Sequence, residues 1–210
     1  MQASALPDAY ARWEAPALQI VGSALGIACQ PTGPAAPGAP GSAPAPNLPP
    51  VSDPTVRLVI ARVAAQLGKP YAWGGGNAAG PTHGTPGGGS QAARFGDVNK
   101  VGFDCSGLMV YAFAGAGIVV PHQTQAIWAT FRPPITNRAQ FQPGDMVLAS
   151  SNGQPSGIDH VGLYLGNGQV IDAPESGKNV QIEQNIFTNP WWASHVIGAV
   201  RPLATVGSRA

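Results

Sequence analysis

Cysteine and charged residues are both scarce in this chain of 210 residues. The two cysteines, Cys29 and Cys105, cannot form a disulfide framework, so packing must stabilise the fold. Cys29 lies in no recognisable motif and could be a free thiol or part of an intermolecular bridge. The 11 Lys and Arg residues nearly balance the 10 Asp and Glu residues, and a net charge of +1 offers no surplus for nucleic-acid binding. We therefore exclude a nucleic-acid partner.

Long apolar runs are missing as well. The longest weakly polar run, residues 15–28, is too short to span a bilayer, so we expect no membrane span. The basic start of a signal peptide is not visible, because Asp8 and Glu14 accompany a single Arg12. Low charge, with 28 glycines and 22 prolines, nevertheless suits an exported protein. We expect a secreted or cell-wall location, with the signal removed or another export route in use.

The prolines are concentrated in one segment. Residues 31–54 contain 9 of the 22 prolines, interleaved with Ala and Gly, a composition that favours solvated polyproline II. We predict a linker over residues 31–53, between an N-terminal segment at residues 1–30 and a domain at residues 54–203, with a tail at residues 204–210. The first segment could cover the cleft of the domain as a regulatory element, and a disordered or wall-spanning tail is the alternative.

Three helices are indicated in the first half of the domain. The first follows a cap at Ser52 or Asp53, and its apolar residues have helical spacing: Val56, Val59, Ile60, Val63 and Leu67. The second starts at Cys105, because Asp104 is a good N-cap, and a shorter helix covers residues 124–130. Between the first two helices, residues 77–100 have no apolar periodicity, and we expect a long surface loop there.

The second half of the domain has the alternation that is typical of β-strands. Five strands are predicted, over residues 146–149, 160–165, 169–173, 180–183 and 196–200. Gly166-Asn167-Gly168 indicates a tight turn between the second and third of them. Helices followed by a meander of strands predict an α+β fold, with N-terminal helices packed on a central antiparallel sheet.

Cys105 is the candidate nucleophile. An uncharged thiol is a poor nucleophile, so a catalytic cysteine needs surroundings that favour the thiolate. In the first turn of a helix capped by Asp104, unpaired backbone N–H groups and the helix dipole favour an anion. The dipole contributes only about 0.3–2 kcal/mol, so a neighbouring base must supply the rest.

His160 is the candidate base, and Asp172 is its candidate partner. The alternating run from residue 160 to 165 fixes the His160 side chain on one face of a strand. Counting outward from a turn centred on Asn167 pairs position 162 with 172, so Asp172 lies diagonally within reach of His160. Its carboxylate could then orient the imidazole, as the third member of a catalytic triad does.

Four segments resemble the NlpC family of peptidoglycan endopeptidases. They are Tyr71-Ala72-Trp73-Gly74-Gly75, Phe103-Asp104-Cys105-Ser106-Gly107-Leu108, Pro143-Gly144-Asp145 and residues 160–168. The similarity covers about residues 54–202, and within the family it is greatest to mycobacterial cell-wall endopeptidases. The resemblance implies a papain-like fold and hydrolysis of peptidoglycan stem peptides, typically between D-γ-glutamate and meso-diaminopimelate, without a metal or other cofactor.

The resemblance also assigns roles to single residues. It makes Cys105 the nucleophile and His160 the base, and Asp172 stands where the family has a variable polar third residue. It implies that Tyr71 lines the cleft, and that Asp104 and Ser106 flank the nucleophile where some members contact the substrate. The backbone N–H of Cys105 would then help to stabilise the oxyanion.

Two departures from the family pattern keep other functions open. The segment from Trp73 to Phe103 is longer than usual, and Ile127 stands where a glutamine is common. A non-catalytic or latent peptidoglycan-binding module on the same fold is therefore the main alternative to a peptidase. Group transfer or amidation on this fold is a further one. His122 could cap its helix or reach the cleft.

Overall fold

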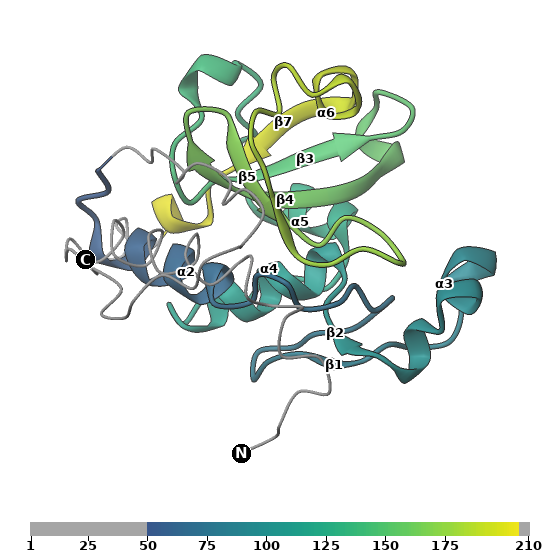
Figure 1. Cartoon of the computed structure of the whole chain (residues 1–210). Helices are drawn as coiled ribbons and strands as arrows, with labels where there is room; N and C mark the ends of the chain where they lie inside the picture. The colour runs from purple at the N-terminus through teal and green to yellow at the C-terminus, as the bar shows by residue number, and fades with distance from the viewer. Residues whose placement is uncertain (1–49, 206–210) are drawn as a thin grey trace, which may run out of the picture.

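The computed structural model describes residues 50–205, which form a central antiparallel sheet covered by helices (Figure 1). The predicted N-terminal segment, nearly all of the predicted linker, and residues 206–210 lie outside the described residues. Five strands make the central sheet in the order β6-β5-β4-β3-β7. They are β3 (Met146–Ser150), β4 (Ile158–Gly166), β5 (Gln169–Asp172), β6 (Gln181–Glu183) and β7 (Val196–Val200). The prediction of an α+β fold with an antiparallel sheet is confirmed.

The two faces of the sheet bury different side chains because successive residues of a strand point to opposite sides. In β3, Met146 and Leu148 join the larger core cluster, whereas Val147 and Ala149 join the smaller one. The larger cluster lies between the sheet and three helices, α2 (Pro54–Ala64), α4 (Cys105–Ala114) and α5 (Thr124–Thr130). The smaller cluster packs around Trp192 of α6 (Pro190–His195), which contacts β3.

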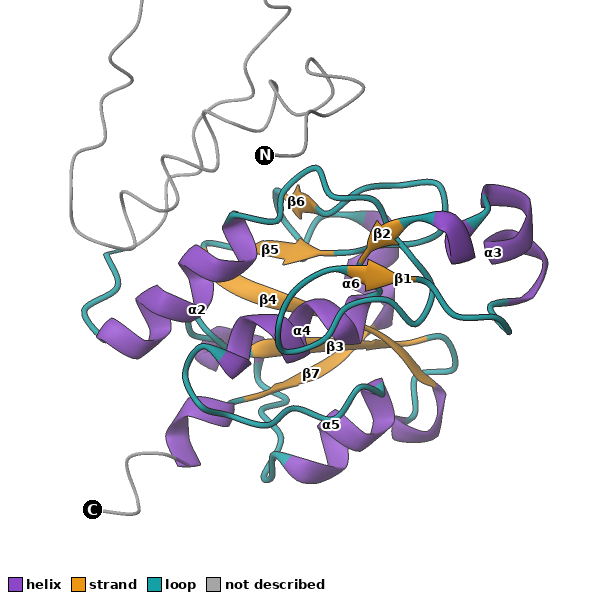
Figure 2. Cartoon of the chain, turned by 90° about the horizontal axis from the view of Figure 1, so that it is seen from below, coloured by secondary structure: helices purple, strands orange, loops and turns teal. Residues whose placement is uncertain are grey.

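Side chains cap the starts of α2 and α4. The Asp53 carboxylate accepts hydrogen bonds from the Thr55 and Val56 N–H groups at the start of α2, with Pro54 in the first turn. Asp104 caps α4 in the same way. Seen from below, α2 and α4 cross in front of the strands (Figure 2). The predicted helices at residues 54, 105 and 124–130 are confirmed.

The prediction of a long surface loop over residues 77–100 is wrong. This segment contains β1 (Thr82–His83), α3 (Gly89–Phe95) and the 3₁₀ turn η1 (Asp97–Asn99), and β1 pairs with β2 (Val101–Gly102). Only Ala92 of α3 is buried, so the helix leaves no apolar periodicity in the sequence. The segment projects beside the main sheet (Figure 1) and is held by buried polar contacts instead.

Three further 3₁₀ turns connect the elements: η2 (Arg138–Gln140), η3 (Pro155–Gly157) and η4 (Pro202–Thr205). Helix α6 was not expected from the sequence. Asn189 caps it by accepting hydrogen bonds from the Trp191 and Trp192 N–H groups. Within residues 50–205, no helix combines the length and the apolar character that crossing a bilayer demands.

Candidate active site

Cys105 occupies the first turn of α4, where the structure buries it almost completely. Its Sγ lies 3.9 Å from the Asp159 carbonyl oxygen on β4. The Asp104 Oδ1 atom accepts a 2.6 Å hydrogen bond from the Gly107 N–H and so closes the start of the helix. The sulfur therefore lies at the positive end of a capped helix that packs directly on β4.

His160 and Asp172 meet across two neighbouring strands. Leu163 of β4 pairs with Ile171 of β5, which is the register that counting from the turn predicted. In that register the His160 Nε2 and Asp172 Oδ2 atoms are 2.7 Å apart, and both side chains are buried. The predicted contact between these two residues is therefore present.

The same imidazole also interacts with Cys105. Burial alone would lower the pKa of His160, but hydrogen bonds with Asp172 and with the Cys105 sulfur, together with their negative charges, raise it to about 10. The imidazole is thus held in its protonated form between an acidic side chain and the sulfur. A charged imidazole beside a cysteine is one of the surroundings that a catalytic cysteine needs.

A cleft of about 510 Å³ opens beside His160. Its walls are formed by residues from two separate parts of the sequence, namely Tyr71, Trp73, Asp159, His160, Asp172, Pro174, Glu175, Lys178, Glu183, Asn189, Trp191 and Trp192. Its size is typical of a ligand-binding pocket. Among the predicted substrate-binding residues, Tyr71 lines this cleft, and burial followed by the negative charges of Cys105 and Asp104 raises its pKa well above the ordinary value. Tyr71 is therefore a neutral group in the wall.

Asp104 and Ser106 are not among the residues that line the cleft. The Asp104 carboxylate instead accepts hydrogen bonds from the Gly107 N–H, the Ser106 hydroxyl and the Gly74 N–H, and it lies 3.0 Å from His122 Nε2. The hydrogen bond with Asp104 raises the pKa of His122, whereas partial burial acts in the opposite direction. Asp104 thus ties helix α4 to its neighbours, and its contact with substrate stays a prediction.

Sequence reasoning missed one wall of the cleft. Trp191 and Trp192 belong to α6, Asn189 caps that helix, and Glu183 comes from the end of β6. The Asn189-Pro190 pair is a helix-start signal that could have revealed α6. Nothing in the sequence pattern places this short helix beside His160. Within residues 50–205, no group of three or more His, Cys, Asp or Glu side chains is arranged to hold a metal ion.

Comparison with known proteins identifies the family of this chain. The NlpC/P60 family model matches residues 68–201. RipA of Mycolicibacterium smegmatis, named a peptidoglycan endopeptidase, is 42% identical over 127 residues. This stretch is 60% of the present chain and 22% of RipA, so the chain spans only a minor part of that relative.

Solved structures extend the similarity to the fold. The peptidoglycan hydrolase RipB of Mycobacterium tuberculosis has 30% identity and a TM-score of 0.57, covering 95% of this chain and 85% of the RipB chain. RipD of the same organism, described as non-catalytic and adapted to peptidoglycan binding, has 34% identity and a TM-score of 0.55. That match covers 70% of this chain and 96% of the RipD chain. The chain therefore belongs to the NlpC/P60 family and has its papain-like α+β fold.

Proposed function

We propose that this protein is a cysteine endopeptidase that hydrolyses the stem peptides of peptidoglycan at the bond between D-γ-glutamate and meso-diaminopimelate. The observation that supports this most directly is the pairing of His160 with both Asp172, at 2.7 Å, and the Cys105 sulfur. The names of the RipA and RipB relatives favour the same substrate class. Peptidoglycan lies outside the cytoplasmic membrane, so the proposal includes a secreted or cell-wall location.

The proposed reaction is acyl transfer in two steps. The Cys105 thiolate attacks the carbonyl carbon of the glutamyl residue, and the protonated His160 gives its proton to the departing diaminopimelate amine. A water molecule then gives a proton to His160 and attacks the thioester, which releases a glutamate carboxylate and restores the thiolate. In this proposal the backbone N–H of Cys105 donates a hydrogen bond to the oxyanion of the tetrahedral intermediate.

Asp172 is the orienting group in this proposal. Its contact with His160 Nε2 leaves the other ring nitrogen for the sulfur, and its charge favours the imidazolium that gives a proton to the leaving amine. A carboxylate in this position is buried, with 1% of the side chain exposed, so water does not weaken the contact.

A non-catalytic binding module is the second candidate, because RipD is described in those terms and is 34% identical to this chain. The feature that favours the enzyme is that cysteine, histidine and a carboxylate are all present here and interact. A binding module needs the cleft but has no use for this protonated imidazole beside a sulfur.

Digestion of a purified disaccharide-tripeptide from peptidoglycan, followed by mass spectrometry, tests the proposal. We expect free diaminopimelate and a glutamate-terminated fragment from the wild type, and a loss of at least about 1,000-fold in kcat/KM for Cys105→Ala. Cys29→Ala, which removes the other thiol, is the matched control and should retain full activity. Intact substrate with the wild type, under conditions in which a known endopeptidase cleaves it, would favour the binding module. Equal activity of Cys105→Ala would remove the nucleophile assignment.

A further inference from the structure

Two large aromatic side chains stay exposed inside the cleft. Trp191 is 45% exposed and Trp73 is 42% exposed, and both line the cavity beside His160. Most large apolar side chains of the described domain are buried in its two clusters. Aromatic side chains that remain exposed in a concave site are common ligand anchors, because each provides a large rigid contact area.

Trp191 is fixed by its neighbours. The His195 ring stacks against it, with centroids 4.8 Å apart and planes 13° apart. Trp192 and His160 meet it edge to face, at 5.4 Å and 5.6 Å between centroids. One face of the indole is therefore covered by His195, and the ring cannot turn freely. The ring is thus held in place for a ligand before the ligand arrives.

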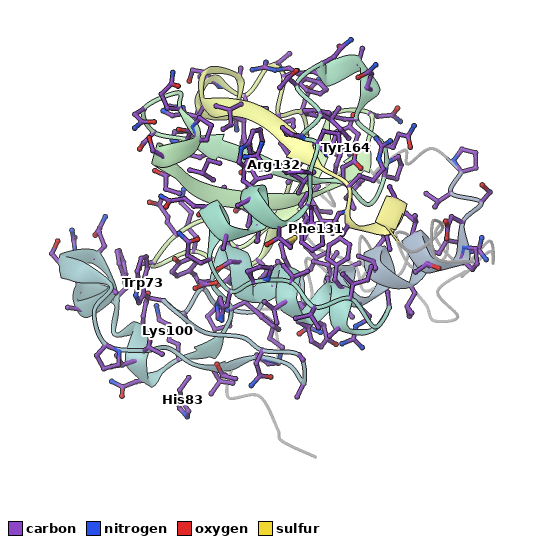
Figure 3. The ribbon with its side chains drawn as sticks, turned by 180° about the vertical axis from the view of Figure 1, so that it is seen from behind. Trp73, His83, Lys100, Phe131, Arg132 and Tyr164 are labelled. Carbon is purple, nitrogen blue, oxygen red and sulfur yellow. The ribbon has the colours of Figure 1, made fainter. Side chains whose placement is uncertain are left out.

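Trp73 is fixed by the segment that was expected to be a loop. A Cβ atom added at Gly88, just before α3, would collide with the Trp73 ring, so only glycine leaves room for this packing. The backbone N–H of Trp73 also donates a hydrogen bond to Asp97 Oδ2. The same oxygen accepts a 2.6 Å hydrogen bond from the Ser176 hydroxyl. Figure 3 shows Trp73 beside this segment. The 77–100 segment thus holds in place one residue of the cleft wall, Trp73.

An oriented carboxylate lies in the same cleft. Glu183 accepts hydrogen bonds from Gln181 Nε2, at 2.6 Å, and from Asn189 Nδ2, at 3.0 Å. These two donors hold the carboxylate while it lines the cavity. It can accept further hydrogen bonds, because an ionised carboxylate has about four acceptor positions. Asn189 also caps the helix that carries Trp191, which couples the two groups structurally.

We propose that Trp191, together with Glu183 in the wall of the same cleft, forms a saccharide subsite that binds the amino sugar to which the stem peptide is attached. This inference rests on the proposed function and names the part of the substrate that gives it specificity. The stem residues next to the bond, glutamate and diaminopimelate, have narrow and flexible side chains that cannot cover a fixed indole. A pyranose ring presents a flat C–H face of similar size, and its hydroxyls can donate to the carboxylate.

The length of the substrate allows this arrangement. The scissile bond follows the γ-carboxyl group of the second residue of the stem, so a lactyl group and two residues separate it from the sugar, and two extended residues alone span about 7 Å. Trp191 and His160 line the same cleft, so a sugar against the indole and the reacting bond beside His160 can occupy it together. We therefore expect the enzyme to prefer stems that still carry their sugar over free peptides.

Calorimetric titration of the Cys105→Ala variant tests the subsite without turnover. The probes are the disaccharide-tripeptide and the same tripeptide with an N-acetylated amino terminus. We expect the sugar to tighten binding about tenfold, the size of an aromatic contact plus one hydrogen bond. Adding Trp191→Ala should remove this difference and leave peptide affinity within about twofold. Trp191→Phe should restore part of the difference in affinity between the two probes. Val119→Ala, at an 88% exposed residue outside the cleft, should leave both affinities unchanged.

Glu183→Gln gives a second test that does not depend on the folding of a tryptophan variant. This substitution should weaken the binding of the glycosylated probe only. Equal affinity of the two probes would overturn the inference. Tighter binding of a tripeptide with a free amine than of the disaccharide-tripeptide would do the same, because it would identify the aromatic ring as a partner of a cation. Failure of the wild type to cleave muropeptides would remove the proposed function, whereas these titrations would still decide whether the subsite exists.

Discussion

At the scale of single residues, His160 is subject to two opposing effects. Burial disfavours its charge, whereas Asp172 and the Cys105 sulfur favour it, and the second effect is larger. Asp172 could be found from the sequence, because a tight turn at Asn167 fixes the register of the two strands that follow it. The observed pairing matches that count even though the register shifts near the turn itself.

Replacing Asp172 should change stability in a pH-dependent way. Because the folded-state pKa of His160 is raised to about 10 from 6.5, its contact with Asp172 stabilises the fold fully below about pH 6.5. This contribution is lost as the pH rises through about 10. We expect Asp172→Asn to lower the free energy of unfolding by about 3–5 kcal/mol at pH 6, as removal of one partner from a buried ion pair does. The difference from wild type should shrink steadily towards pH 10.

Urea unfolding at a series of pH values measures this effect. Glu175→Gln is the matched control, because it removes an exposed ion pair, with Lys178, from the same cleft. That variant should lose less than about 1 kcal/mol at every pH. A destabilisation by Asp172→Asn that is constant from pH 6 to pH 10 would show that the carboxylate acts without a protonated His160.

At the scale of elements, helix α4 positions Cys105, the proposed nucleophile. Its N-cap, Asp104, connects the start of the helix with Gly74 and His122. The sequence predicts this helix and its cap because the signal is local, an Asp directly before an apolar segment. Helices α3 and α6 leave weaker signals, because they are short and each buries only one side chain. Their position depends on tertiary contacts that no local pattern contains.

Two N-caps of the same residue type separate stability from activity. Asp104→Ala and Asp53→Ala should each lower the free energy of unfolding by about 1–2 kcal/mol, the usual cost of losing a helix cap. Only Asp104→Ala should also lower kcat/KM, by at least about tenfold, because the helix that it caps carries Cys105. Asp53 caps α2, away from the cleft, and its variant should keep wild-type kinetics.

Unfolding curves combined with steady-state kinetics distinguish the two variants. Unchanged kcat/KM in Asp104→Ala would mean that the position of the sulfur does not depend on this cap. A loss of activity of the same size in Asp53→Ala would mean that both variants act only through general stability.

At the scale of the whole molecule, the site is assembled from distant parts of the sequence. Tyr71 and Trp73 precede the nucleophile helix, His160 and Asp172 lie on the central strands, and Trp191 comes from the last helix. The motifs around Cys105, His160 and Asp172 are visible in the sequence, whereas the common cleft results from the strand order β6-β5-β4-β3-β7. For this reason these three residues could be proposed as candidates from the sequence, whereas the wall formed by α6 and the structure of the 77–100 segment could not be predicted.

The domain boundaries stay a proposal at this scale. Both core clusters of the described residues fall within the predicted domain, and a partly buried Val51 packs against the larger one. We propose that residues 54–203 form the catalytic unit. The proposed regulatory role of residues 1–30 concerns a part of the chain that the structure does not describe.

The central claim is that a protonated imidazole at His160, held by Asp172, lies beside the Cys105 sulfur. A pH titration of the histidine side chains by ¹H–¹⁵N NMR tests it most directly, with the His160 signals assigned from a His160→Gln variant. The account predicts that both ring nitrogens of His160 stay protonated at pH 8 and titrate near pH 10, and that Asp172→Asn lowers this midpoint. A neutral His160 at pH 8 in the wild type, or a midpoint that does not change in Asp172→Asn, would contradict it.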